Sequence, residues 1–236
     1  MNDILEFKNV CKSFGNKQIL KNVNLKIQPN KIIGLLGQNG SGKTTIFKLI
    51  NDLFTVTSGE ILFCGKHIGV ESKKEISYLP ERTYFDKYTS VEEALKFFET
   101  FYDNFDREKA EKLLLDLNLD KTQSMEKMSK GMKEKVQLVL VMSRHAKLYI
   151  LDEPLGGVDP ATRDYILDTI LRNFEDDATL LISTHMIADI EKILDEVIFI
   201  DNGEIVLHEN ADELRQKENK SIDEIFRSKI YGKKSY

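Results

Sequence analysis

The spacing of apolar residues changes along this chain, and each change predicts a different kind of element. Residues 4–10 and 23–27 alternate apolar with polar side chains, which predicts two half-buried strands on either side of a turn at Phe14-Gly15-Asn16. Residues 31–36 form a short apolar run typical of a buried strand, and residues 44–53 space their apolar side chains at helical intervals. The chain is therefore expected to begin with an antiparallel portion, followed by a strand, a glycine-rich turn and a helix.

Helical spacing then dominates for a long stretch, so we expect a helical insertion at approximately residues 88–146. After it, short apolar runs alternate with helical patterns, which is typical of parallel βαβ units. The expected strands cover residues 148–151, 179–183 and 197–200, and the expected helices cover residues 161–174 and 187–194. Asn202-Gly203 is a hairpin signal that adds an antiparallel edge strand, and residues 210–236 predict a short helical tail. We expect one α/β domain over residues 1–236, with a mostly parallel sheet, an N-terminal antiparallel β portion and an inserted α-helical subdomain.

The glycine-rich turn matches the phosphate-loop pattern G-x-x-x-x-G-K-[ST], in the strand-to-helix context that this pattern requires. Its residues are Gly37, Gln38, Asn39, Gly40, Ser41, Gly42, Lys43 and Thr44. The glycines let the backbone turn its amide groups around a phosphate, and the following helix directs its positive dipole end at the same anion. Lys43 would neutralise β- and γ-phosphate oxygens, Thr44 would offer its hydroxyl to Mg²⁺, and Thr45 could donate to the α-phosphate. The alternative is a glycine turn that only caps the helix. The pattern and its context favour a P-loop NTPase core.

Two acidic residues, Asp152 and Glu153, end the apolar run of residues 148–151. In a doubly wound sheet the ligand crevice lies beyond the carboxyl ends of the strands, so both acids can reach the phosphate loop. Successive strand residues point in opposite directions, which predicts different tasks for the two carboxylates. We assign Asp152 to Mg²⁺, and Glu153 to the attacking water as general base or orienting group. The alternative is a turn-initiating Asp-Glu-Pro without a ligand.

His185 follows the apolar run of residues 179–183 and should lie at the same edge of the sheet. A neutral imidazole there could reach a γ-phosphate and take part in catalysis. The alternative is a surface or helix-capping histidine.

Composition disfavours several classes of function. The 34 Lys and Arg against 39 Asp and Glu give a net charge of −5, so electrostatics argue against nucleic acid as a partner, and any bound anion needs a local site. Apolar runs such as residues 138–142 are far shorter than the roughly 20 residues that cross a bilayer, and the N-terminal residues lack the apolar segment of a secretory signal. We expect a cytoplasmic protein. Cys11 and Cys64 are too few for a four-ligand metal site and are expected to be reduced thiols.

Further motifs occur in the order of a known family. Met128-Ser129-Lys130-Gly131-Met132, at the expected start of a helix, is similar to the signature L-S-G-G-Q. Val158-Asp159-Pro160 resembles the loop after the carboxylates, Ser183-Thr184-His185 the switch histidine, and Phe14 the adenine-stacking aromatic residue. Together with the phosphate loop and the strand before Asp152, these motifs make the chain resemble, over essentially its whole length, the ATP-binding subunit of an ATP-binding-cassette (ABC) transporter.

This resemblance implies ATP and Mg²⁺ as ligands and a second ATP-binding cassette as partner, either an identical chain or a related one. Ser129 and Gly131 would then contact the other subunit's ATP, Asp159 would lie in a dimer-interface loop, and Phe14 would stack on the adenine. Without the resemblance, Ser129 is simply a helix N-cap and Phe14 an ordinary core residue. The resemblance also implies a separate integral-membrane transport subunit, with this chain bound peripherally at the cytoplasmic face of the cell membrane.

Two departures from the family pattern point to a subgroup. Tyr78-Leu79-Pro80-Glu81 puts Glu81 where the family usually has Gln; a carboxylate can still bind Mg²⁺ but adds negative charge beside the triphosphate. Lys130 and Met132 replace the usual Gly and Gln. Both departures look like those in ATPases of bacterial exporters of drugs, antibiotics and amphipathic peptides. The resemblance therefore implies an ATPase that powers export. The alternatives are an importer ATPase, a non-hydrolysing regulatory cassette and a soluble cassette protein that acts on DNA or ribosomes.

The aromatic stretch Thr83-Tyr84-Phe85-Asp86-Lys87-Tyr88 is a candidate docking site for the membrane subunit. The alternative is that these aromatic residues pack inside the helical insertion.

Overall fold

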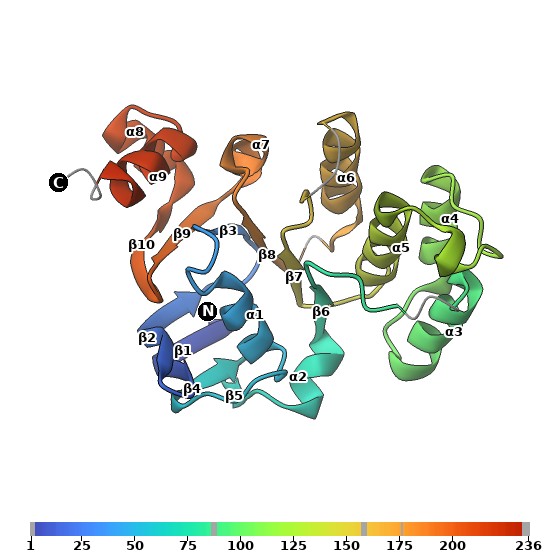
Figure 1. The fold of residues 1–236 in the computed structure, drawn as a ribbon, viewed down its shortest axis with the longest axis horizontal. Helices are drawn as coiled ribbons and strands as arrows, with labels where there is room; N and C mark the ends of the chain where they lie inside the picture. The colour runs from blue at the N-terminus through green and yellow to red at the C-terminus, as the bar shows by residue number, and fades with distance from the viewer. Residues whose placement is uncertain (1–2, 86–88, 157–159, 176, 233–236) are drawn as a thin grey trace.

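The computed structural model describes residues 3–85, 89–156, 160–175 and 177–232, and its strands form two sheets (Figure 1). The smaller sheet is antiparallel and has the strand order β2-β1-β4-β5. Its strands are β1 (Leu5–Phe14), β2 (Lys17–Ile27), β4 (Ser58–Phe63) and β5 (Lys66–His67). The larger sheet has the order β10-β9-β3-β8-β7-β6. Its strands are β3 (Ile32–Gly37), β6 (Ile76–Leu79), β7 (Leu148–Asp152), β8 (Thr179–Thr184), β9 (Glu196–Asp201) and β10 (Glu204–Asn210).

The larger sheet confirms the predicted parallel arrangement with one antiparallel edge. Strands β6, β7, β8, β3 and β9 run parallel to their neighbours, and β10 pairs antiparallel with β9. Asn202 and Gly203 join β9 to β10 with φ angles of 49° and 83°. Positive φ at both positions is what the predicted two-residue hairpin turn requires.

Two apolar cores lie on opposite faces of the larger sheet, and β7 contributes to both. Leu148 and Ile150 belong to the core that contains α1 (Lys43–Ile50) and the inner face of the antiparallel sheet. Tyr149 and Leu151 belong to the core that contains the helices after residue 90. This alternation follows from the two-residue period of a strand whose faces are both covered. The phosphate loop therefore leaves the sheet between two packed layers.

The helical segments expected between residues 88 and 146 lie together beside β6 (Figure 1). They are α3 (Val91–Phe101), α4 (Arg107–Asp116), the short 3₁₀ helix η1 (Met125–Lys127) and α5 (Lys130–Met142). Ser90 begins α3 with a capping box that involves Glu93. The apolar stripe of α3 is buried as its spacing predicts.

Other helices surround the rest of the sheet. They are α2 (Val70–Glu75), α6 (Pro160–Asn173), α7 (Ile187–Ile190), the 3₁₀ helix η2 (Glu191–Ile193), α8 (Ala211–Glu218) and α9 (Ile222–Ile230). Within the residues described here, no helix is both long enough and apolar enough to cross a membrane.

Several boundaries differ from the prediction; β2, for example, begins at Lys17 and not at residue 23. Phe14 is the last residue of β1 and pairs with Lys17 across the hairpin, so the turn contains only Gly15 and Asn16. Helix α1 ends at Ile50 and not at residue 53, because Asp52 adopts a left-handed backbone with φ of 53° that ends the helix.

Candidate functional site

The loop between β3 and α1 has the backbone of an anion site. Gly40 and Gly42 have φ angles of 79° and 116°, which favour glycine. A Cβ atom on Gly37 would lie 2.5 Å from the Ser41 hydroxyl and 2.6 Å from the Ile200 carbonyl oxygen, so this position has no room for a side chain. No side chain caps the first turn of α1. Its amide groups therefore remain available for an anion, as the phosphate-loop pattern predicts.

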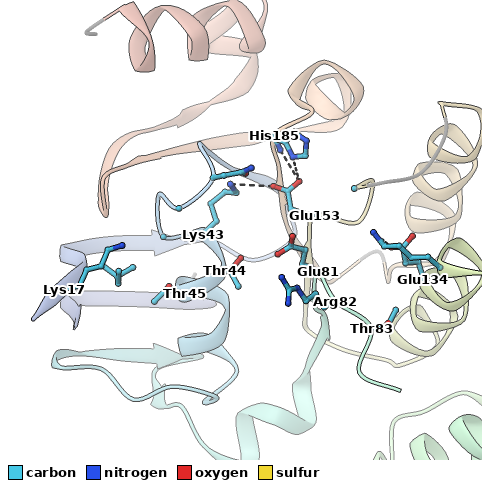
Figure 2. Close-up of a pocket in the computed structure, with 16 residues that line it drawn as sticks. Lys17, Lys43, Thr44, Thr45, Glu81, Arg82, Thr83, Glu134, Glu153 and His185 are labelled. Carbon is cyan, nitrogen blue, oxygen red and sulfur yellow. Dashed lines mark hydrogen bonds and ion pairs between the residues drawn. The ribbon is translucent and has the colours of Figure 1, made fainter. Parts of the chain in front are cut away.

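Lys43 folds back over this loop. Its side chain is only 6% exposed, and its ammonium group donates to the carbonyl oxygens of Gly37 at 2.8 Å and Gln38 at 3.3 Å. The same group lies 3.6 Å from Glu153 Oε1 (Figure 2). The lysine is thus held by neutral carbonyls and one carboxylate, partners that a phosphate could replace with stronger charge-assisted hydrogen bonds.

Asp152 ends β7 and is buried, with 1% of its surface exposed. Its Oδ1 atom accepts a hydrogen bond from the Ser183 hydroxyl at 2.7 Å, whereas its Oδ2 atom is buried and has no hydrogen-bond partner among the described residues. Burial raises the pKa of this carboxyl above its usual range; hydroxyls of Ser183 and Thr44 oppose the rise, and the charges of Glu153 and Glu81 add to it. A buried carboxylate oxygen without a donor is suited to a cation.

The surroundings of Asp152 fit Mg²⁺ better than a metal held by protein side chains alone. In the described part of the chain, no three His, Cys, Asp or Glu side chains form a metal-binding group. Mg²⁺ typically takes one or two carboxylates together with substrate phosphates and water. Asp152 and the Thr44 hydroxyl supply protein oxygens next to the phosphate loop, so these residues could hold the ion when a nucleotide is bound.

Glu153 sits in a left-handed backbone conformation with φ of 52°, which is uncommon for a residue with a side chain. Its amide donates to the Ser183 carbonyl oxygen at 3.0 Å and lies 3.2 Å from the Ser183 hydroxyl. Its Oε2 atom accepts from the His185 amide at 3.2 Å and lies 2.8 Å from His185 Nδ1. The carboxylate is thus held between Lys43 and His185, directly above the loop (Figure 2).

The pairing of β7 with β8 explains this cluster. Asp152 lies opposite Ser183 in the parallel ladder, so the carboxyl ends of both strands deliver their polar residues to the same edge. His185 therefore reaches the predicted edge, and the group that it contacts there is the Glu153 carboxylate. Its side chain is 54% exposed, so it also faces the open cavity.

A cavity of about 1070 Å³ lies in front of the loop and contains residues that the motifs did not single out. Its walls are formed by Lys17, Ile19, Asn39, Gly40, Gly42, Lys43, Thr44, Thr45, Glu81, Arg82, Thr83, Lys130, Glu134, Glu153, Gly156 and His185. Lys17, Ile19, Arg82, Thr83, Glu134 and Gly156 were not predicted as site residues. Arg82 and Thr83 directly follow Glu81, which is the sequence signal that could have indicated them.

Other predicted site residues lie apart from this cavity. Phe14 is not one of the described residues that line the cavity. Its side chain is 44% exposed, and its ring packs edge-on against Phe54 with 5.1 Å between the ring centroids. The Lys12 ammonium lies over the same ring. Ser129 is the N-cap of α5 and accepts from the Met132 amide at 3.3 Å. Gly131 follows in the first turn of α5, and Asp159 lies outside the described residues. Adenine stacking by Phe14 and contacts of Ser129, Gly131 and Asp159 with a second cassette stay predictions.

Known proteins resemble this chain in sequence and in structure. The ABC transporter family model matches residues 20–156. The ABC transporter ATP-binding protein YtrB of Bacillus subtilis is 33% identical over 218 residues, which cover 91% of this chain and 74% of that protein. The lantibiotic transport ATP-binding protein SrtF of Streptococcus pyogenes is 30% identical over 238 residues, covering 98% of this chain and 99% of that protein.

A solved structure of an ATP-binding subunit of an ABC transporter superimposes with a TM-score of 0.84 at 27% identity, covering 94% of this chain and 98% of that one. The matched segment contains the phosphate loop, the two carboxylates and the helical segments described above. The chain therefore belongs to the ABC transporter family, as an ATP-binding subunit that hydrolyses ATP.

Proposed function

We propose that this chain hydrolyses Mg-ATP in the cavity at the phosphate loop and thereby powers export through a separate membrane subunit. The observation that carries the catalytic part is the position of Glu153, which is fixed by Ser183 and His185 and faces Lys43 across the loop. A carboxylate held there can accept a proton from water, or orient it, next to the place where the terminal phosphate would bind.

Each residue at the loop has a separate task in this proposal. The amides of residues 37–44 and the Lys43 ammonium bind the phosphates, and Lys43 exchanges its carbonyl partners for phosphate oxygens. Thr45, in the first turn of α1, donates to the α-phosphate. Asp152 and the Thr44 hydroxyl would hold Mg²⁺, which would neutralise charge on the phosphates. Glu81, whose charge acts on Asp152, is a further candidate ligand.

His185 acts mainly through Glu153. Its Nδ1 atom lies 2.8 Å from Glu153 Oε2, and its amide donates to the same oxygen. It therefore orients the carboxylate, and its exposed ring edge remains available to a γ-phosphate. Ser129 and Gly131 at the exposed start of α5 would complete the site of a second cassette, and Asp159 would lie between the two chains.

The partner in the membrane is proposed to bind near the segment after Glu81. Tyr84 is 50% exposed, and Phe85 is partly buried against the core. A hollow of about 530 Å³ adjoins them, lined by Tyr84, Phe85, Thr89, Glu93, Ala94, Phe97 and Phe98. Residues 86–88 lie outside the described structure. An exposed aromatic hollow of this kind suits an apolar protein segment, and this chain would lie at the cytoplasmic face of the membrane.

Replacing Tyr84 and Phe85 with alanine should uncouple transport while leaving ATP binding intact, because neither side chain reaches the nucleotide cavity. Transport in cells and ATP affinity of the purified chain are the measurements. Phe97→Ala, which removes an exposed ring from the same hollow, should act in the same direction with less effect on folding. Normal transport in both variants would rule out these residues as the docking surface for the membrane subunit.

The cargo is proposed to be a drug, an antibiotic or an amphipathic peptide. Two observations support this: SrtF, which is similar over nearly the full length of both chains, is named for lantibiotic transport, and Glu81 and Lys130 depart from the usual family pattern in the way that exporter ATPases do. Neither of these observations favours an importer ATPase or a regulatory cassette that does not hydrolyse ATP. The position of Glu153 also argues against a regulatory cassette.

Glu153→Gln tests the catalytic part of the proposal. The amide keeps the shape of the side chain but cannot accept a proton from water, so ATP turnover should fall by about 10²- to 10⁴-fold while ATP binding persists. Turnover of [γ-³²P]ATP and equilibrium ATP binding give the two readings. Equal turnover in the variant and the wild type would exclude Glu153 as the catalytic carboxylate.

A further inference from the structure

Arg82 stands in the wall of the nucleotide cavity without a partner of its own. In the part of the chain that the structure describes, its guanidinium makes no hydrogen bond or ion pair, although it is an exposed neighbour of Glu81. Every other described arginine has a hydrogen bond or an ion pair: Arg107, Arg144, Arg163, Arg172, Arg215 and Arg227. An uncommitted guanidinium inside a ligand cavity is available for an anionic ligand.

Carboxylates gather near the phosphate loop, although the wall of the cavity also carries Lys17, Lys43, Arg82 and Lys130. Glu81 and Glu153 line it, and Asp152 lies just behind Glu153. A nucleotide triphosphate adds several negative charges, and like charges at short distance disfavour binding. Lys43 is one cation opposite them, but it already lies 3.6 Å from Glu153. Mg²⁺ at Asp152 and Thr44 would offset part of this charge, and Arg82 is the cationic side chain next to Glu81 that could offset more.

The other cations of the cavity are less well placed for this task. Lys130 lies 3.5 Å from Glu134, its neighbour one turn along α5. Lys17 is on β2, beyond Thr45, at the opposite side of the cavity from Glu153 (Figure 2). Arg82 is next to Glu81, and its nitrogen atoms lie on the side that faces Thr44 and Thr45 (Figure 2). Lys43 and Arg82 therefore approach the phosphate site from two sides.

We propose that Arg82 is a nucleotide-binding residue whose guanidinium binds oxygens of the terminal phosphate and offsets the charge of Glu81. This inference rests on the proposed function, because it requires ATP in the cavity. The planar guanidinium suits phosphate, since two parallel N–H groups can bind two oxygens. A terminal phosphate is present in ATP and absent from ADP, so Arg82 would make the site favour ATP over ADP.

The test compares Mg-ATP and Mg-ADP affinities by calorimetry, in the full chain that carries Glu153→Gln so that ATP persists. Arg82→Gln should weaken Mg-ATP binding by about 10- to 100-fold and leave Mg-ADP binding unchanged. Arg82→Lys should lose less, because it keeps the charge without the fork. In the Glu81→Gln background, Arg82→Gln should cost much less, because the charge to be offset is gone.

Two control variants distinguish binding of the terminal phosphate by Arg82 from the loss of any positive charge. Lys17→Gln removes a cation from the other side of the same cavity and should change both affinities alike. Arg172→Gln removes an exposed surface arginine and should change neither. If Arg82→Gln changes ATP and ADP binding equally, or changes neither, or costs as much without Glu81 as with it, the proposal is wrong. Absence of any ATP binding by the parent chain would instead contradict the proposed function.

Discussion

Glu153 shows how one residue can be constrained for chemistry. A left-handed backbone costs a residue with a Cβ about 1–3 kcal/mol. Here the Glu153 amide donates to Ser183 and the Glu153 carboxylate accepts from the His185 amide, and these hydrogen bonds hold the residue in place. The result is a carboxylate that lies 3.6 Å from the Lys43 ammonium and 2.8 Å from His185 Nδ1. The sequence predicted different tasks for the two adjacent acids, because strand residues alternate. It could not predict the backbone conformation, which depends on contacts with β8.

The buried carboxylate of Asp152 should lower the stability of the protein at neutral pH. Its pKa is above the ordinary 3.8 in the folded protein, so folding disfavours the charged form that is present at neutral pH. The contribution of Asp152 to the free energy of unfolding therefore rises as the pH falls through its raised pKa, and this rise is complete below 3.8. Asp152→Asn removes the buried charge and should raise the free energy of unfolding at pH 7 by about 1–3 kcal/mol without nucleotide.

Urea unfolding at several pH values measures this effect. The advantage of Asp152→Asn should shrink as the pH approaches the ordinary range of an aspartate, because the wild-type carboxyl is then neutral as well. The variant should also lose the effect of Mg²⁺ on ATP affinity. Lower stability of the variant at pH 7, or a difference that does not depend on pH, would contradict the account of Asp152.

The hairpin turn between β9 and β10 is the element that ties the site together. The Gly203 amide donates to the Ser41 carbonyl oxygen at 3.0 Å, and the Gly203 carbonyl oxygen accepts from the Lys21 amide at 2.9 Å. A Cβ atom on Gly203 would lie 2.0 Å from the Ile19 carbonyl oxygen. One turn therefore contacts the phosphate loop and β2, which carries Lys17 and Ile19 into the cavity.

Gly203→Ala should consequently damage both the fold and the site. Gly65→Ala is the matched control, since Gly65 has a φ of +76° against +83° for Gly203, but a Cβ atom on Gly65 would have no described neighbour within 4 Å. The control should cost about 1–2 kcal/mol for the left-handed backbone alone. Gly203→Ala should cost about 1–3 kcal/mol more for the close contact and should weaken ATP binding. Urea unfolding and ATP titration measure both, and equal losses in the two variants would show that the turn does not support the site.

Elements with a strong local period were predictable, and elements defined by distant partners were not. The apolar stripe of α3 and the alternating strands after residue 146 appear in the sequence as regular spacing. Strands β4 and β5 and helix α2 gave no comparable signal. Strand β5 has only two residues and α2 only six, and β4, although as long as β8, begins with the polar run Ser58-Gly59-Glu60. The pairing of β4 with β1 and of β5 with β4 decides the structure of these strands. A pairing between residues as far apart as those of β1 and β4 leaves no local pattern.

In the whole molecule, the cavity in front of the phosphate loop lies where three parts of the fold meet. The antiparallel sheet contributes Lys17 and Ile19, the parallel sheet contributes Glu153 and His185, and the helical segment at α5 contributes Lys130 and Glu134 (Figures 1 and 2). The phosphate loop, the acids and the histidine were predictable because motif spacing places them at one sheet edge. The convergence of the other two parts depends on how the layers pack, which one sequence does not reveal.

The loop of residues 37–44 should bind the phosphates of ATP, with Asp152 and Glu153 facing them. The most direct measurement is a crystal structure of the Glu153→Gln chain with ATP and Mg²⁺. We expect the Lys43 ammonium to leave the carbonyl oxygens of Gly37 and Gln38 and to contact the β- and γ-phosphates, with Mg²⁺ next to Thr44 and Asp152. A structure in which the nucleotide is bound elsewhere, while Lys43 keeps both carbonyl partners, would contradict the account.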